Sequence, residues 1–282
     1  MLADYHVHTE FSDDSSYLLK DICRDAVKLG LNEICITDHV DYGVKPDADE
    51  YRAGGATYRL EDGLPVLNVD YERYFPAIDR VREQFAGQLV VKTGMEFGVQ
   101  THTEPQFNAL FERYADRWDF IILSIHQVGD QEFWSGDFQR DRTQDEYNMA
   151  YYQEMLDVVQ SFSHYSVLGH LDLIKRYDPA GIWPHEKSRD IVAEILRRVI
   201  ADGKGIELNT SSFRYKLPDL QPCTEILRLY RDLGGRILTI GSDSHKPEHL
   251  GAHIAEVRDR LRALGFTEFC TFEKLEPVFH KL

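Results

Sequence analysis

The sequence DYHVHTEFSDDS, residues 4–15, begins with a short run that suits a β-strand. In an extended strand successive side chains point to opposite faces, so His6 and His8 share one face and Val7 lies on the other. Two imidazoles on one face suit a metal ion, although an isolated His-x-His pair is equally typical of a solvated strand end. The rest of the chain decides between these interpretations, because the same pattern recurs along it.

A helix and a second strand follow this stretch and complete a β-α-β unit. Residues 17–30 have the apolar spacing of a helix, and Gly30 suits its C-terminal cap. The next strand, residues 32–39, is apolar and ends in Asp38-His39. The first two strands therefore end in possible metal ligands, and their connection is typical of a parallel sheet.

The alternation of strand and helix continues along the chain. Further strands are predicted at 88–96, 119–126, 166–170, 205–210 and 236–245. Helices are predicted at 71–85, 103–114, 143–162, 188–202, 223–233 and 247–264, before a short run at 268–272. Thr103-x-x-Gln106 and Thr143-x-x-Glu146 resemble capping boxes that begin two of these helices. Seven strands without a glycine-rich nucleotide motif after the first favour an α/β fold of the closed or nearly closed barrel type over an open doubly wound sheet.

Residues 41–70 interrupt this alternation. They are rich in Asp, Gly, Pro and Glu and have no clear period, so we expect an insertion in one domain that spans residues 1–282. Loops of about this length are usually functional lids or disordered segments. The insertion is therefore either a lid over a substrate or an insertion without a function.

Composition narrows the possible partners. The formal net charge of -16 argues against a partner such as long nucleic acid, which needs clustered basic residues. The chain has neither an apolar run long enough for a membrane span nor a leader with a basic and an apolar part, and we expect a cytoplasmic protein without a membrane partner. The four cysteines are widely spaced, which indicates neither a zinc ribbon nor a disulfide framework.

Possible metal ligands collect at the ends of six predicted strands. They are His6, His8, Asp14, His39, Glu96, His126, His170, Asp243 and His245. In a parallel barrel these strand ends share one rim, and so many clustered polar groups would lack partners without metal. One carboxylate such as Glu96 can bridge two ions, so three divalent ions are a natural number. The absence of thiolates leaves zinc, manganese or iron open.

The motifs that carry these residues resemble a known family. They are His-Val-His8 with Phe-Ser-x-Asp-Ser15, Ile-Thr-Asp-His39, Gly-Met-Glu96, Ser-Ile-His126, Gly-His170 and Gly-Ser-Asp-Ser-His245. In this order, over nearly the whole chain, they are similar to the polymerase and histidinol phosphatase (PHP) family of metal-dependent phosphoesterases. The resemblance implies a distorted (β/α)7 TIM-like barrel with the active site at the C-terminal ends of the strands.

The resemblance also implies how the ligands divide among three ions. The first ion would be held by His6, His8, Glu96 and Asp243. The second would be held by Glu96, His126 and His170, and the third by Asp14, His39 and His245. Asp38, beside His39, is expected to orient a ligand.

Two further stretches look most like the histidinol-phosphate phosphatase branch of this family. They are GHLDLIKR at 169–176 and ELNTSSFR at 207–214. The similarity implies a phosphomonoesterase for a small phosphorylated substrate, L-histidinol phosphate, in histidine biosynthesis. Arg176 and Arg214 are predicted to bind phosphate through their planar guanidinium groups, with Lys246 a weaker candidate. The alternative for Arg176 is a solvated side chain or a pair with Asp178.

A mechanism follows as a hypothesis. A hydroxide that bridges two ions would attack phosphorus from the side opposite the ester oxygen, with Glu96, Asp243 and His245 as the catalytic residues. A metal-bound water or His245 would protonate the leaving alcohol. Residues of the insertion, among them Asp41, Tyr42 and Asp47, are candidates to receive the ammonium and imidazole groups of the substrate.

Two other functions fit the same ligand set. One keeps the metals and changes the substrate to nucleotides, oligonucleotides or phosphotyrosine. The other is a non-catalytic module that only binds metal. The sequence leaves the oligomeric state and the native metal open.

Overall fold

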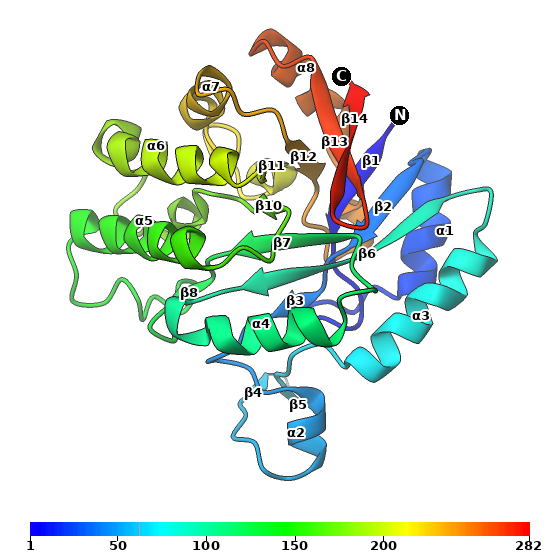
Figure 1. Ribbon diagram of the computed structural model, residues 1–282. Coiled ribbons are helices and arrows are strands. Elements are labelled where there is room, and N and C mark those ends of the chain that lie inside the picture. The colour runs from blue at the N-terminus through cyan, green and yellow to red at the C-terminus, as the bar shows by residue number, and fades with distance from the viewer. Residues whose placement is uncertain (62) are drawn as a thin grey trace.

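A curved parallel sheet forms the centre of the computed structural model, which describes residues 1–61 and 63–282. Its strands lie in the order β1-β2-β6-β7-β10-β11-β12, which is their order along the chain (Figure 1). They are β1 (Ala3–Val7), β2 (Glu33–Ile36), β6 (Val90–Gly98), β7 (Phe120–Ser124), β10 (Val167–Leu168), β11 (Gly205–Asn209) and β12 (Leu238–Gly241). A further short strand, β3 (His39–Val40), pairs with the end of β6.

The sheet nearly closes into a barrel between its first and last strands. The backbone N–H of His8 donates to the carbonyl of Ser244 at 2.8 Å, and the N–H of Ser244 donates to the carbonyl of His6 at 3.2 Å. These bonds lie just beyond β12, so the seam is joined at the C-terminal ends of the strands. The predicted seven-stranded, nearly closed barrel is confirmed.

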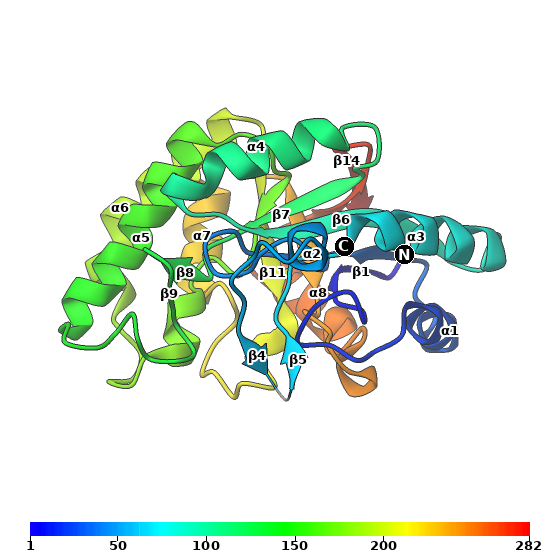
Figure 2. The ribbon, with the colours of Figure 1, turned by 90° about the horizontal axis from the view of Figure 1, so that it is seen from below.

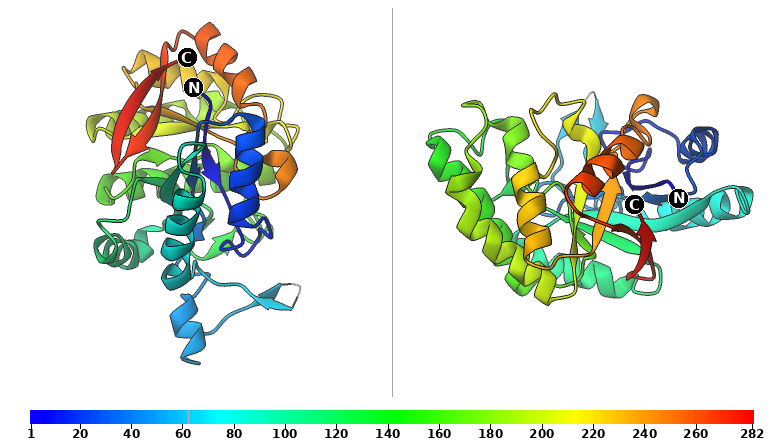
Figure 3. Two further views of the ribbon diagram at one scale, coloured as in Figure 1. Left: turned by 90° about the vertical axis from the view of Figure 1, so that its right-hand side faces the viewer. Right: turned by 90° about the horizontal axis from the view of Figure 1, so that it is seen from above.

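Helices cover the outside of the barrel, as the views in Figures 2 and 3 show. They are α1 (Leu19–Leu29), α3 (Tyr71–Gln84), α4 (Glu104–Arg113), α5 (Gln144–Ser161), α6 (His185–Ala201), α7 (Thr224–Asp232) and α8 (Ile254–Ala263). Gly30 caps α1 at a φ of 74°, and Thr143 and Glu146 form a capping box before α5, as predicted. None of the described helices is both long and apolar enough to span a membrane.

Two predicted helix boundaries are wrong. Thr103 does not cap α4 with Gln106, because its side chain bonds to Gln100 in a capping box around the short 3-10 turn Thr101–Thr103. The predicted helix 247–264 is interrupted: a 3-10 turn at Pro247–His249 precedes the break, and α8 begins only at Ile254. The break turns at Gly251, at a φ of 66°, where the N–H donates to Asp4 Oδ2 at 2.9 Å.

An antiparallel hairpin ends the chain, and its second strand was not predicted. The hairpin consists of β13 (Glu268–Glu273) and β14 (Glu276–Lys281). Leu275 N donates to the carbonyl of Asp119 at 2.9 Å, and Glu273 forms an ion pair with Lys92. Lys92 and Asp119 lie near the starts of β6 and β7, so the hairpin covers the barrel end opposite to the rim.

The insertion projects from the barrel (Figures 1 and 3). Contrary to the expectation of no regular structure, it contains α2 (Ala48–Arg52) and the strand pair β4 (Leu60–Glu61) and β5 (Leu64–Pro65). Asn68 closes its base: Oδ1 accepts from Asp41 N at 2.8 Å, and Nδ2 donates to the carbonyl of Lys45 at 2.9 Å.

Candidate metal centre and active site

A pocket of about 400 Å³ opens at the C-terminal ends of the strands. Seven of the nine predicted ligands line it, and His6 and His8 lie fully buried beside them. The pocket is also lined by both predicted phosphate-binding arginines, Arg176 and Arg214, and by Lys246. The structure therefore brings all the predicted metal ligands and phosphate-binding residues to one place.

Glu96 is the centre of this cluster. Its Oε1 lies 3.1 Å from His126 Nε2 and 2.8 Å from His170 Nε2. Its Oε2 is within 3.4 Å of three more imidazole nitrogens, those of His6, His8 and His39. A carboxylate that is fully buried among five imidazoles, each oxygen facing a different group, suits a bridge between two cations.

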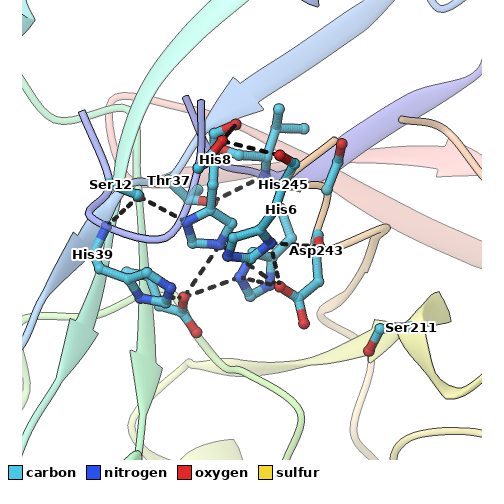
Figure 4. A network of polar contacts seen from close by, with 12 residues as sticks. His6, His8, Ser12, Thr37, His39, Ser211, Asp243 and His245 are labelled. Atoms are coloured by element: carbon cyan, nitrogen blue, oxygen red, sulfur yellow. Dashed lines mark hydrogen bonds and ion pairs between the residues drawn. The ribbon is translucent and has the colours of Figure 1, made fainter. Parts of the chain in front are cut away.

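Two further carboxylates, Asp14 and Asp243, extend the cluster, and Figure 4 shows Asp243 beside His6 and His245. Asp243 Oδ1 lies 3.8 Å from His6 Nε2 and 3.5 Å from His245 Nδ1. Asp14 Oδ2 lies 3.1 Å from His245 Nε2 and 3.6 Å from His39 Nε2. Several triads of these residues place their ligand atoms within 4.8 Å of one another, among them Glu96, His126 and His170.

Four buried polar atoms, namely Glu96 Oε2 and the three imidazole nitrogens within 3.4 Å of it, have no hydrogen-bond partner within the described part of the chain. They are His6 Nε2, His8 Nε2, His39 Nδ1 and Glu96 Oε2. Unpaired buried polar atoms cost free energy, and native structures rarely leave them unsatisfied. Because Glu96 Oε2 lies 3.1–3.4 Å from each of the three imidazole nitrogens, divalent cations bound in this cluster would give these atoms partners. The donor set, imidazole and carboxylate only, fits such an ion.

The tautomers of three histidines agree with this interpretation. His6 Nδ1 lies 2.6 Å from a Glu207 carboxylate oxygen, and His126 Nδ1 lies 2.8 Å from Asp41 Oδ1. His245 Nδ1 donates to the carbonyl of Asp243 at 3.0 Å. Each of these acceptors requires a proton on Nδ1, so Nε2 is the nitrogen available to bind a cation. Ligand histidines in metal sites are oriented in this way.

Asp38 was predicted to orient a ligand, and its contacts lead to His8 rather than to the neighbouring His39. Its carboxylate accepts from Thr9 N at 2.6 Å and from Ser12 Oγ at 2.7 Å, rather than from the His39 ring. Because the Ser12 hydroxyl proton is used there, Ser12 Oγ accepts from His8 Nδ1 at 3.1 Å. Asp38 therefore orients His8 through Ser12.

Charge in the cluster follows from burial and from neighbours. Burial raises the pKa of Asp243, but His6, Arg214 and Arg176 hold this pKa well below its usual value. Burial likewise raises the pKa of Glu96, and His6 and the other imidazoles hold it well below its usual value. Burial together with His245 and His39 lowers the pKa of His8. Both carboxylates are thus ionised and His8 is neutral, the states that bind cations.

The two arginines lie beside Asp243 and are held in place by other polar groups. Arg176 donates through Nε to Gln221 Oε1 at 2.8 Å and through Nη2 to Asp243 Oδ2 at 3.1 Å. Arg214 donates through Nη1 to the carbonyl of Ser242 at 2.7 Å. Arg176 is neither solvated nor paired with Asp178, which instead accepts from the Tyr147 hydroxyl and neighbouring groups.

The insertion contributes different residues from those predicted. Asp41 lines the pocket, but it is only 3% exposed and pairs with Lys45 and His126. Within the described residues, Tyr42 and Asp47 bond to each other at 3.1 Å and lie outside the pocket lining. The pocket instead receives Lys45, Arg59 and Glu61 from the insertion, together with Asp13 and Trp134 from neighbouring loops.

Glu207 is the functional residue that the sequence analysis missed. It is fully buried, bonds to His6, and accepts from His170 N at 2.9 Å. A Cβ on Gly241 would lie 2.4 Å from Glu207 Oε1, so a glycine there leaves room for this contact. The available signal was an acidic residue in the middle of an otherwise apolar predicted strand.

The fold and the site together define the class of protein. A nearly closed parallel barrel, with imidazoles and carboxylates gathered at one rim beside two arginines, is the arrangement of a metal-dependent phosphoesterase. The PHP domain model matches residues 4–211, well over half of the chain, and the chain therefore belongs to the PHP family.

Similar proteins match the chain over nearly their whole length. The chain is 30% identical to the histidinol-phosphatase of Lactococcus lactis over 97% of this chain and 95% of that protein. It is 28% identical to a probable histidinol-phosphatase of Thermotoga maritima, over 94% of this chain and 93% of that protein. The crystal structure of the Lactococcus lactis histidinol phosphate phosphatase, complexed with zinc, L-histidinol and phosphate, superposes with a TM-score of 0.83 at 29% identity and covers 98% of both chains. A putative histidinol phosphatase from Listeria monocytogenes, 19% identical with a TM-score of 0.70, has the same fold.

Proposed function

We propose that this protein is a histidinol-phosphate phosphatase, which hydrolyses L-histidinol phosphate to L-histidinol and phosphate. The observation that carries the proposal is the match, over 98% of both chains, to a phosphatase crystallised with zinc, L-histidinol and phosphate. The nine clustered ligands and two adjacent arginines of this chain supply the groups that such a reaction requires.

We assign the nine ligands to three divalent ions, which are zinc, manganese or iron. His6, His8, Glu96 and Asp243 would hold the first ion. Glu96, His126 and His170 would hold the second, and Asp14, His39 and His245 the third. When bound, such ions lower the pKa of the water that attacks phosphorus and neutralise charge on the phosphoryl group.

Arg176 and Arg214 are the groups that would bind and orient the phosphate. Both line the pocket, and both lie within 3.4 Å of Asp243 through an Nη atom. Gln221 and the Ser242 carbonyl hold the two guanidinium groups in place, so little side-chain entropy is lost when phosphate binds. The arginines would also neutralise charge that accumulates on the non-bridging oxygens. Lys246, which lines the same pocket, would add to this field.

His245 serves better as a ligand than as the acid that protonates the leaving alcohol. Its Nδ1 proton is donated to the carbonyl of Asp243 at 3.0 Å. Its Nε2 faces the cluster, 3.1 Å from Asp14 Oδ2, and a metal ion held by His245 would occupy this nitrogen. The ring therefore offers no proton on the side that faces the cluster.

The outer part of the pocket would receive the leaving group. There the insertion contributes Glu61, and a neighbouring loop contributes Trp134, which is 48% exposed. A carboxylate and an aromatic face suit the ammonium and imidazole groups of histidinol. In this role the insertion is a lid on a single phosphoesterase domain. The cytoplasmic location of the protein remains a prediction.

The test is phosphate release from L-histidinol phosphate by zinc-loaded and chelated protein, compared with nucleoside monophosphates and phosphotyrosine. We expect metal-dependent turnover with kcat/KM at least about tenfold higher for L-histidinol phosphate, a difference of about 1.4 kcal/mol in transition-state binding. Faster turnover of a nucleotide or of phosphotyrosine would contradict the proposed substrate. Binding of metal without turnover of any substrate would indicate a metal-binding module.

A further inference from the structure

We infer that Asp41 and Lys45, which lie at the start of the insertion, are positioning residues that fix His126 in the orientation and tautomer that bind metal. The inference rests on the proposed function, because it takes His126 as a ligand. It also gives the insertion a role at the metal centre that is separate from covering the substrate.

The contact between Asp41 and His126 sets the tautomer. Asp41 Oδ1 lies 2.8 Å from His126 Nδ1, and an ionised carboxylate can only accept a hydrogen bond. The proton is therefore on Nδ1, and Nε2, which lies 3.1 Å from Glu96 Oε1, is the nitrogen available to a metal ion. Such carboxylate–histidine pairs raise the basicity of a ligand and hold its ring in place.

Lys45 holds Asp41 in this position. Its Nζ lies 2.9 Å from Asp41 Oδ2 and 2.6 Å from Asp13 Oδ1, and Lys45 is only 7% exposed. This ion pair places an ammonium group beside the Asp41 carboxylate, which favours the ionised form of the carboxylate. Asp41 is thus an ionised acceptor, and Lys45 compensates a buried charge that would otherwise be unpaired.

Asp13 extends this network to the other side of the site. It precedes the predicted ligand Asp14 in the chain. The sequence of contacts Asp13–Lys45–Asp41–His126 therefore joins the loop that carries Asp14 to the ligand group around Glu96.

The barrel wall leaves space for this contact at one position. A Cβ on Gly98, the last residue of β6, would lie 1.8 Å from Asp41 Oδ1 and 2.9 Å from His126 Nδ1. Any side chain there would displace the carboxylate from the imidazole. Glycine at this position is therefore explained by the approach of Asp41 rather than by its backbone conformation.

The base of the insertion carries the contact. Asn68, near the end of the insertion, bonds to Asp41 N and to the carbonyl of Lys45, and Lys45 N donates to the carbonyl of Asp41 at 3.0 Å. The hydrogen bonds that order this turn therefore also fix the Asp41 carboxylate that orients His126. By thermodynamic reciprocity, if the turn strengthens metal binding, metal binding strengthens the turn to the same degree.

The first experiment measures zinc affinity by competition with a chromophoric chelator. The proteins are wild type, Asp41→Asn, Lys45→Met, the double variant, and the control Asp49→Asn in the exposed part of the insertion. We expect Asp41→Asn to weaken zinc binding about 10- to 100-fold at the site that includes His126. Lys45→Met should weaken it less and add nothing in the Asp41→Asn background, because Lys45 acts through Asp41. The control should match wild type.

The second experiment measures amide hydrogen exchange of residues 42–47 with and without zinc. We expect zinc to slow this exchange in wild type and to slow it much less in Asp41→Asn. Gly98→Ala provides an independent variant, which should reproduce the loss of zinc affinity while both Asp41 and Lys45 remain.

Several outcomes would overturn the inference. Wild-type zinc affinity in Asp41→Asn is one, and an undiminished effect of Lys45→Met in the Asp41→Asn background is another. These results are distinct from failure of the proposed function, in which wild type would bind zinc with the predicted dependence on Asp41 but release no phosphate from L-histidinol phosphate.

Discussion

The rim of the barrel and the base of the insertion are both buried, polar and charged, yet they differ in how completely the chain satisfies their polar atoms. At the rim, four polar atoms around Glu96 lack partners within the described residues. At the base of the insertion, Asp41, Lys45 and Asn68 bond to one another and to their neighbours. Buried groups that lack protein partners indicate a place for a ligand, whereas satisfied ones indicate support. The site therefore consists of a rim whose buried polar atoms need a ligand, supported by a base of the insertion whose polar groups have partners within the protein.

The largest effect should come from removing the carboxylate at the centre of the rim. Glu96→Ala deletes the oxygens that face five imidazoles, so metal binding and turnover should fail together. We expect kcat/KM to fall at least about 1,000-fold, or about 4 kcal/mol. Metal content by mass spectrometry should fall in parallel. Glu83→Ala, on the exposed side of α3, is the matched control. Full metal content in Glu96→Ala would contradict the role of Glu96 at the centre of the metal site.

Removal of metal should be the next largest effect, and it acts on stability as well as on activity. Dialysis against a chelator should abolish turnover, and zinc or manganese should restore it. A ligand at a hundred times its Kd stabilises the folded state by about 2.7 kcal/mol, which is about 5–10 °C in Tm for a chain of this size. Differential scanning calorimetry with and without zinc measures this shift. An unchanged Tm would show that the rim is stable without a cation.

Arg214→Ala should separate phosphate binding from metal binding. The side chain lies beside Asp243, and its guanidinium group has only hydrogen-bond donors, so it is not a metal ligand. We expect kcat/KM to fall about 10- to 100-fold, mainly through KM, since a charge-assisted hydrogen bond contributes about 1.5–3 kcal/mol. Metal content should be unchanged. Arg236→Ala, on an exposed part of the surface, controls for loss of charge. Loss of metal in Arg214→Ala would contradict the role in phosphate binding.

The smallest effect should come from the outer pocket. Trp134→Ala removes an aromatic face that is 48% exposed. An aromatic contact contributes about 0.5–1.5 kcal/mol, so KM for L-histidinol phosphate should rise about two- to tenfold. Hydrolysis of p-nitrophenyl phosphate, which lacks the ammonium and imidazole groups, should change less. An equal effect on both substrates would show that Trp134 does not contact the leaving group.

The sequence predicted the rim better than the base because the rim is encoded locally. Most of the ligands follow a run of apolar residues, and parallel strands bring such ends together whatever the loops do. The supporting contacts are not local. Glu207 and His6 are 201 residues apart, and Asp41 and His126 are 85 residues apart. Nothing near either carboxylate in the sequence indicates its partner.

The errors in the predicted fold have comparable causes. β14 was missed because the hairpin turns through Lys274 and Leu275, both at positive φ, without the Asn-Gly or Asp-Gly pair that usually marks such a turn. The helix predicted from residue 247 has suitable composition, but Asp4, which is more than 240 residues away, fixes the turn at Gly251. In both places, tertiary contacts or an unusual backbone conformation override the local pattern.

The most direct measurement is an anomalous difference map from a crystal of the zinc-loaded protein, recorded at the zinc absorption edge. We expect peaks within about 2.0–2.2 Å of the Glu96 carboxylate oxygens and of imidazole nitrogens of His6 and His126. A map without peaks beside Glu96, recorded with zinc in excess, would contradict a metal centre at this rim.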